Sequence, residues 1–326
     1  MFTMPSESQE KRPRKSGPAK LGLGTYRQDP ATLACLLDRY VGIGGRDVDT
    51  ASNYGNGFSQ HAVGKFHQQL SGNKLSLKVS TKIGFVPSCD RQDLIQKDVI
   101  SQQDITHQQC FSKSFLRYQI NKAVTQLGSI DTIFLHNPDQ YSQHVDFEKF
   151  EASMLACIEE LEAACSMGLI KRYGIATWAG FRSKVNQDAL SLGSWVARAT
   201  RIAGTANHLS AIQLPVSLIE LDAIEDLMVR KSGVLAEAEA AGIEVISSAP
   251  LHGGCIPKQI DQTFCDFISP GLSAAQASVL FAFSVPGIDV VLIGPRTVEQ
   301  LTDIWQLQQQ PRLSVDKVAE IISLVR

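Results

Sequence analysis

Short runs of β-branched and apolar residues alternate along the chain with longer stretches of helical periodicity. Eight of the short runs have the length and composition of strands. Strands that alternate with helices are typical of βα units, which build a parallel sheet. The predicted strands are residues 20–25, 47–50, 77–82, 132–136, 173–177, 211–214, 244–248 and 290–294.

Amphipathic segments follow these strands, and Gly128, Gly168 and Gly242 stand where a left-handed residue would end a helix. Eight strands, each followed by a helix, predict an α/β fold, a closed (β/α)8 TIM barrel rather than an open sheet. The periodic stretch 315–325 predicts an extra C-terminal helix outside the barrel. The other predicted helices are residues 31–41, 60–70, 115–127, 147–167, 184–203, 233–241, 274–283 and 298–307.

Two segments fall outside this repeating pattern. Residues 1–19 are polar and basic, which predicts a flexible tail ahead of a single barrel domain over residues 20–326. Residues 85–114 form a connection of about thirty residues, unusually long unless it covers a site. We expect this long loop to lie on the substrate side of the barrel and to close over the substrate; the alternative is that it packs on the outer helices.

Composition narrows the choice of partners. The 31 Lys and Arg nearly balance the 33 Asp and Glu, so no global field attracts nucleic acid or an anionic membrane surface, and a small-molecule partner is expected. The most apolar stretch, 272–288, is interrupted by polar residues and Pro286, so no transmembrane helix is expected. Seven cysteines without a CxxC motif indicate neither a disulfide framework nor a zinc knuckle. A reducing, cytoplasmic location fits this cysteine usage.

Four ionisable residues fall where the strands of such a barrel meet at one rim. Asp49, Lys82 and His136 end the second, third and fourth strands, and Tyr54 follows the second. Polar residues at these strand ends line the barrel mouth. An Asp paired with Lys82 would hold the cation beside the Tyr54 hydroxyl and lower the pKa of Tyr54 from about 10 toward neutrality. Tyr54 is therefore a candidate general acid.

Each of these residues alone also has an ordinary structural explanation: a solvated Lys, a hydrogen-bonded His or a capping Asp. Motifs of other chemistries are absent from the sequence. It contains no HExxH motif, no HxH at a strand end and no GxSxG, which argues against metal catalysis and serine hydrolysis. It also contains no GxGxxG, so a Rossmann domain is unsupported. No metal site is predicted.

The chain resembles the aldo-keto reductases, NAD(P)H-dependent oxidoreductases on a (β/α)8 barrel, from residue 21 to about residue 307. The variants GIATW and LHNPD are similar to a less-studied bacterial branch of that family. The motifs that carry the resemblance are LGLGTY (21–26), DVDTASNYGNG (47–57), STKIG (80–84), IDTIFLHNPD (130–139), GLIKRYGIATW (168–178), IQLPVSL (212–218), GIEVISSAPL (242–251) and LIGPRTVEQL (292–301).

The resemblance implies a catalytic tetrad of Asp49, Tyr54, Lys82 and His136. By that analogy Tyr54 protonates the carbonyl oxygen, Lys82 with Asp49 tunes Tyr54, His136 orients the substrate, and the hydride comes from C4 of the nicotinamide. Substrate contacts are implied for Tyr26 and Trp178.

The implied cofactor residues depart in places from the family pattern. Thr177 replaces a common amide-binding Asn, Ser248 and Ala249 replace a Tyr and a Ser, so the usual aromatic stack on the nicotinamide is missing, and Ile304 replaces a frequent Asn. Cofactor binding is still expected. The implied contacts are Thr25, Thr177, Gln213, Ser248, Leu251, Gly294, Arg296, Gln300 and Asp303.

Arg296 bears on the choice of coenzyme. A guanidinium can pair bidentately with the 2′-phosphate that distinguishes NADP from NAD, so NADP(H) is favoured and NAD(H) is possible. The alternative is that Arg296 only caps the region after the eighth strand.

The predicted activity is NAD(P)H-dependent reduction of an aldehyde, ketone or sugar carbonyl to an alcohol, or the reverse, with Tyr54 as general acid. Two alternatives stay open on the same fold: a cofactor-binding regulatory or partner-binding barrel, and a specialised enzyme of a biosynthetic pathway.

Overall fold

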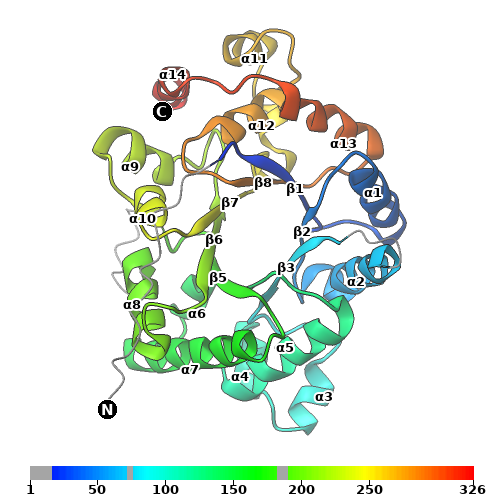
Figure 1. Cartoon of the computed structure of the whole chain (residues 1–326), viewed down its shortest axis with the longest axis vertical. Coiled ribbons are helices and arrows are strands. Elements are labelled where there is room, and N and C mark those ends of the chain that lie inside the picture. Colours follow the sequence, from blue (N-terminus) through cyan, green and yellow to red (C-terminus); the bar gives the residue numbers. More distant parts are fainter. Residues whose placement is uncertain (1–16, 72–75, 182–189) are drawn as a thin grey trace, which may run out of the picture.

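The computed structural model describes residues 17–71, 76–181 and 190–326. Of the expected basic tail, residues 1–16 lie outside the described residues. Within the described part of the chain, eight parallel strands close into a barrel in chain order, so the predicted TIM barrel is confirmed (Figure 1). The strands are Lys20–Gly24 (β1), Asp47–Asp49 (β2), Lys78–Ile83 (β3), Thr132–His136 (β4), Arg172–Ala176 (β5), Leu209–Pro215 (β6), Glu244–Ser248 (β7) and Val290–Ile293 (β8).

The register of neighbouring strands decides which side chains share a level of the barrel. Asp49 of β2 lies opposite Ser80 of β3, so Lys82 stands one pleat closer to the mouth than Ser80. His136 at the end of β4 lies opposite Ala176, which in turn lies opposite Gln213 of β6. Residues from distant parts of the sequence therefore meet at the carboxyl ends of the strands.

The barrel interior is apolar on the side built by β4 to β8. Gly174 makes room there, since a Cβ at this position would lie 2.6 Å from the Phe134 ring. The interior is thus a packed core on this side and not a pore. The buried cluster consists of Phe134, Ala176, Ala211, Ile246, Val290 and Leu292.

Helices surround the strands, and a larger apolar cluster fills the space between the two layers (Figure 1). Many of these helices begin at a Ser, Asp or Thr whose side chain accepts a hydrogen bond from the first turn, as Ser112 and Asp146 do. The helices of the described residues are Pro30–Gly42 (α1), Phe58–Ser71 (α2), Arg91–Gln96 (α3), Gln102–His107 (α4), Lys113–Leu127 (α5), Pro138–Tyr141 (α6), Phe147–Ser166 (α7), Leu192–Ala203 (α8), Asp222–Arg230 (α9), Val234–Ala240 (α10), Gln262–Ile268 (α11), Ala274–Ser284 (α12), Val298–Trp305 (α13) and Val315–Val325 (α14).

The predicted C-terminal helix is confirmed as α14, which packs against α12 outside the ring (Figure 1). The predicted helix 184–203 is described from residue 190 onward and its helical part is α8. Helices α6, α9 and α11 were not expected, because each is shorter than three turns and so spans few helical periods.

The segment 85–114 contains two short helices, α3 and α4, rather than an irregular loop. An antiparallel bridge between Phe85 and Gln109 joins its two ends. Leu94 is fully buried, and Asp90 forms an ion pair with Lys122 of α5. In Figure 1 both helices lie beside α5 at the edge of the molecule and not over the centre of the ring of strands.

Within the described residues, no helix is both long and apolar enough to span a bilayer.

Candidate active site

A buried ion pair occupies the mouth of the barrel between β2 and β3. The Lys82 ammonium group donates to Asp49 Oδ2, and it also donates to the carbonyl oxygen of Thr50 at 3.0 Å. The other carboxylate oxygen, Asp49 Oδ1, accepts hydrogen bonds of 2.9 Å from Ser80 Oγ and from Gln213 Nε2. Three donors therefore fix the orientation of the carboxylate.

Tyr54 reaches this pair from the first turn after β2, a 3₁₀ turn over Tyr54–Gly57. Gly55 and Asn56 both have left-handed backbone angles, with φ near 55°, which folds the chain sharply behind the tyrosine. The Lys82 Nζ lies 4.8 Å from the centre of the Tyr54 ring. On its outer side the Tyr54 ring packs against Tyr26, with ring centres 5.0 Å apart.

His136 faces the same space from the end of β4. Its ring centre lies 6.0 Å from that of Tyr54 and 4.8 Å from that of Phe85. The Gln109 amide donates to the carbonyl oxygen of His136 at 3.0 Å and so fixes the backbone there. Within the described residues, the buried Nδ1 of His136 has no hydrogen-bond partner.

Burial changes the expected acidity of Tyr54. Desolvation of the hydroxyl raises the pKa of Tyr54 above its ordinary value, although the Lys82 cation opposes the rise, and the Asp49 carboxylate adds to it. The ring is partly exposed, but its hydroxyl end lies deep in the mouth beside Lys82. The prediction that the pKa of Tyr54 is lowered toward neutrality is therefore wrong, and Tyr54 stays protonated at neutral pH.

Lys82 and His136 also have shifted pKa values. Burial disfavours the Lys82 cation, yet the Asp49 carboxylate and Tyr54 outweigh burial and raise the pKa of Lys82, so it remains charged. Burial, reinforced by the Lys82 charge, holds the pKa of His136 well below its ordinary value. The site thus contains a cationic Lys82, a neutral His136 and a neutral Tyr54.

The side chains implied for the nicotinamide end of the cofactor already donate hydrogen bonds to Asp49 or to Asp139. The Thr25 hydroxyl donates to the backbone oxygen of Asp49 at 3.0 Å, and the Gln213 amide donates to its carboxylate. The Thr177 hydroxyl donates to the buried Asp139 at 2.5 Å. Thr25 and Gln213 therefore join the catalytic cluster, whereas Thr177 faces β4 and its loop.

The segment after β7 has an unusual backbone. Ser248 ends the strand, and Ala249 and His252 both have positive φ, 52° and 45°. Leu251 directly precedes a 3₁₀ turn over His252–Gly254. The exposed Trp178 lies with its ring centre 5.8 Å from His252, which places it across the mouth from the tetrad rather than within it.

The residues implied for the adenosine end lie together after β8. Gln300 accepts a hydrogen bond of 2.8 Å from the backbone N–H of Arg296, and Gly294, Arg296 and Gln300 are exposed. The backbone oxygen of Asp303 accepts from Gln276 of α12. Ile304 is buried in the apolar core instead. Within the described residues, no ion pair is formed by the Arg296 guanidinium, so its charge is available to a phosphate.

These observations test the fit of a nicotinamide cofactor. The exposed Arg296, a cation after β8, fits a phosphate-bearing group. The fit at the nicotinamide end is less direct. The side chains implied there, Gln213 and Thr177, each already donate a hydrogen bond to a carboxylate of the protein. The residues present therefore fit the cofactor, most clearly at its phosphate end.

Sequence reasoning missed three residues of this site: Ser80, Gln109 and Asp139. Ser80 precedes Lys82 by two positions in a strand, so the alternation of side chains could have placed both on the same face. Gln109 and Asp139 belong to connections whose path no sequence pattern specified.

Comparison with known proteins agrees with the geometry. The family model described as "Aldo/keto reductase family" matches residues 16–326. The chain belongs to the aldo/keto reductase family. Family membership supports an oxidoreductase. No curated protein sequence matches the chain significantly.

Solved aldo-keto reductases share the fold at low sequence identity. One is the aldo-keto reductase AKR11C1 from Bacillus halodurans in its holo form, with a TM-score of 0.67, 17% identity and 96% of each chain covered. Another is an aldo/keto reductase from Klebsiella pneumoniae in complex with NADP and acetate, with a TM-score of 0.64 and 17% identity. That match covers 94% of this chain and 90% of the other.

Proposed function

We propose that this aldo/keto reductase reduces an aldehyde, ketone or sugar carbonyl with NADPH, or catalyses the reverse oxidation. The observation that carries the proposal is the buried Lys82–Asp49 pair beside the Tyr54 hydroxyl. An ion pair held out of water costs folding free energy, which is tolerated where the charged groups serve a function.

Tyr54 is the proposed general acid. Its phenol is protonated at neutral pH, so it can give a proton to a carbonyl oxygen as negative charge develops there. The neighbouring Lys82 cation stabilises the phenolate that remains after the transfer. Reduction should therefore proceed at neutral pH and slow when Tyr54 ionises.

His136 is proposed to orient the carbonyl. A neutral imidazole can donate one hydrogen bond, and its low pKa ensures that it adds no second positive charge beside Lys82. Phe85 and Tyr26 pack against His136 and Tyr54 and form apolar walls around this point.

Bound NADPH would supply the hydride at the nicotinamide. Gln213 and Thr25 are the proposed contacts at that end, with Ser248 and Leu251 alongside, and Arg296 with Gln300 at the other end. An Arg296 guanidinium without an ion-pair partner in the described residues supports preference for the 2′-phosphate of NADPH.

The test is an assay of the purified protein with a panel of aldehydes, ketones and sugars. Loss of reduced nicotinamide absorbance is followed with NADPH and, in parallel, with NADH. Turnover of at least one carbonyl, faster with NADPH, is the expected result. Tight NADPH binding, measured by nicotinamide fluorescence, without turnover of any carbonyl would instead support the regulatory cofactor-binding barrel.

A further inference from the structure

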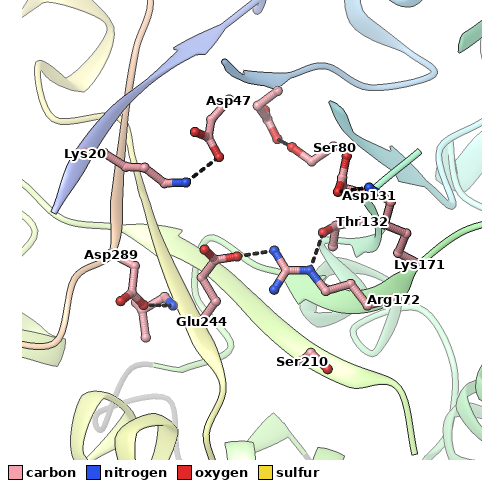
Figure 2. Close-up of polar contacts among 12 residues, drawn as sticks. Lys20, Asp47, Ser80, Asp131, Thr132, Lys171, Arg172, Ser210, Glu244 and Asp289 are labelled. Carbon is pink, nitrogen blue, oxygen red and sulfur yellow. Dashed lines mark hydrogen bonds and ion pairs between the residues drawn. The ribbon is translucent and has the colours of Figure 1, made fainter. Parts of the chain in front are cut away.

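The floor of the barrel, opposite the mouth, carries a ring of charged side chains (Figure 2). Lys20 pairs with Asp47 at 2.8 Å, Arg172 pairs with Glu244, and the Arg172 Nε donates to Thr132 at 2.9 Å. Asp47 and Arg172 keep side-chain exposures of 20% and 29%, so water reaches this ring. The ring surrounds a recess at the amino ends of the strands, lined by these charged groups on one side and by Ile246 and Val290 on the other.

Ser80 lines this recess and also touches the catalytic pair. It is half-buried, and its hydroxyl donates to Asp49 Oδ1 at 2.9 Å. Ser80 and Lys82 share one face of β3, and Asp47 and Asp49 share one face of β2, because side chains alternate along a strand. A column of polar groups therefore runs from floor to mouth along β2 and β3, whereas Phe134, Ile246 and their neighbours fill the other side.

We propose that this column brings protons from the floor to Tyr54 and that Ser80 is the positioning residue at its inner end. The proposal rests on the proposed reduction and deepens it. Substrate and cofactor enter at the mouth, so a route through the floor stays open to water while the mouth is occupied.

The proton balance closes over one turnover. Tyr54 gives its phenolic proton to the carbonyl oxygen, and the Lys82 ammonium then gives a proton to the Tyr54 phenolate. The Ser80 hydroxyl then protonates the Asp49 carboxylate at Oδ1 and at the same time takes a proton from water in the recess. The carboxyl group turns its O–H toward Lys82 and gives that proton to the neutral Lys82 amine, which restores the ion pair. One proton enters from solvent for each alcohol formed.

The chain offers matched variants for this proposal. Ser80→Val and Ser80→Thr are nearly equal in size, and only the threonine keeps the hydroxyl. Thr132→Val is the control: Thr132 lies opposite Ser80 in the register and lines the same recess, but its hydroxyl binds Arg172 and not Asp49.

The first measurement is pre-steady-state reduction by the cofactor-loaded enzyme. Because Tyr54 begins protonated, Ser80→Val should complete its first turnover at the wild-type rate and then run at least about tenfold more slowly, with a larger solvent isotope effect. Ser80→Thr and Thr132→Val should show no such burst. A slowed first turnover in Ser80→Val, an unchanged steady state, or an equal burst in Thr132→Val would overturn the proposal.

A second measurement needs no turnover. The ultraviolet titration of Tyr54 is isolated by subtracting that of the same protein with Tyr54→Phe. Loss of the Ser80 donor leaves more negative charge on Asp49, which disfavours the Tyr54 phenolate. Ser80→Val should therefore move the midpoint of the Tyr54 titration to higher pH by about 0.5 pH unit, a roughly threefold lower ionisation constant. Ser80→Thr should match the wild type. The two failures can be told apart. Absence of carbonyl reduction would contradict the proposed function, whereas an unchanged Tyr54 titration in Ser80→Val would overturn the role of Ser80 whether or not a carbonyl is reduced.

Discussion

The two ends of the barrel both carry Lys or Arg paired with Asp or Glu, yet the pairs differ in their surroundings. At the floor, the Arg172 side chain is 29% exposed and that of its partner Glu244 is 9% exposed. At the mouth, Lys82 and Asp49 are only 1% and 4% exposed. Buried polar atoms without a hydrogen-bond partner in the described residues gather near the mouth: Thr50 Oγ1, Gln109 Oε1 and His136 Nδ1.

This difference in burial indicates that the floor pairs serve mainly the stability of the fold and that the mouth pair serves catalysis. The Arg172–Glu244 pair loses less solvation than a fully buried pair and links β5 to β7 across β6. A buried pair beside unpartnered polar atoms costs folding free energy, which is tolerated where the groups are needed for another purpose. We therefore expect Tyr54→Phe at the mouth to lower activity with little loss of stability, and Glu244→Gln at the floor to lower stability with little loss of activity.

The largest effect is expected for Lys82→Met. Loss of the cation removes the stabilisation of the Tyr54 phenolate, so the reductive rate should fall by at least about 100-fold. Because Lys82 lowers the pKa of Tyr54 against the effect of burial, its loss should also move the high-pH limb of the rate profile to higher pH. Rates measured from neutral to alkaline pH test both effects, and an unmoved limb would contradict the assigned coupling.

Arg296→Ala should change coenzyme choice rather than chemistry. NADPH binding should weaken by roughly 1.5 to 3 kcal/mol, the value of a hydrogen bond to a charged group, while NADH binding should change little. Titration of nicotinamide fluorescence with both coenzymes measures the difference. Equal losses for NADPH and NADH would mean that Arg296 has a structural role only.

At the floor, Glu244→Gln should lower the free energy of unfolding by about 1 to 3 kcal/mol, because Arg172 then loses its charged partner. The reductive rate should stay within about twofold of the wild type, since Glu244 does not touch the tetrad. Denaturant unfolding and the carbonyl assay are run on the same sample. A large fall in rate with unchanged stability would break the proposed division between floor and mouth.

The smallest effect is expected from the segment 85–114. Its helices lie beside α5, so replacing residues 91–107 by a short Gly/Ser linker should raise the Michaelis constant only a few-fold. Phe85→Ala, which removes a ring from beside His136, should alter substrate range more. A stronger effect of the linker than of Phe85→Ala would support the hypothesis that the segment closes over the substrate. His107, in α4, should be dispensable for the chemical step.

Local patterns explain which parts of this fold could be predicted. Strands such as Thr132–His136 and Glu244–Ser248 match their predicted bounds, because their apolar residues form runs that need no tertiary information. Helices α3 and α4 span six residues each, too few to repeat a helical period. The long connection was therefore predicted as a loop.

The prediction of the site was limited in the same way by what local sequence patterns contain. Asp49, Lys82 and His136 could be placed at one rim because parallel strands share a direction. The hydrogen bond from Ser80 to Asp49 depends on the register between β2 and β3, which no periodicity contains. The pKa of Tyr54 rises because burial outweighs the nearby cation, and that balance depends on how deeply the hydroxyl is packed.

The most direct test of the account is the Tyr54→Phe variant, compared with the wild type in carbonyl reduction, coenzyme binding and denaturant unfolding. We predict a reductive rate at least about 100-fold lower, with NADPH affinity and the unfolding midpoint nearly unchanged. A variant that still reduces the same carbonyl at close to the wild-type rate would contradict the assignment of Tyr54 as the general acid.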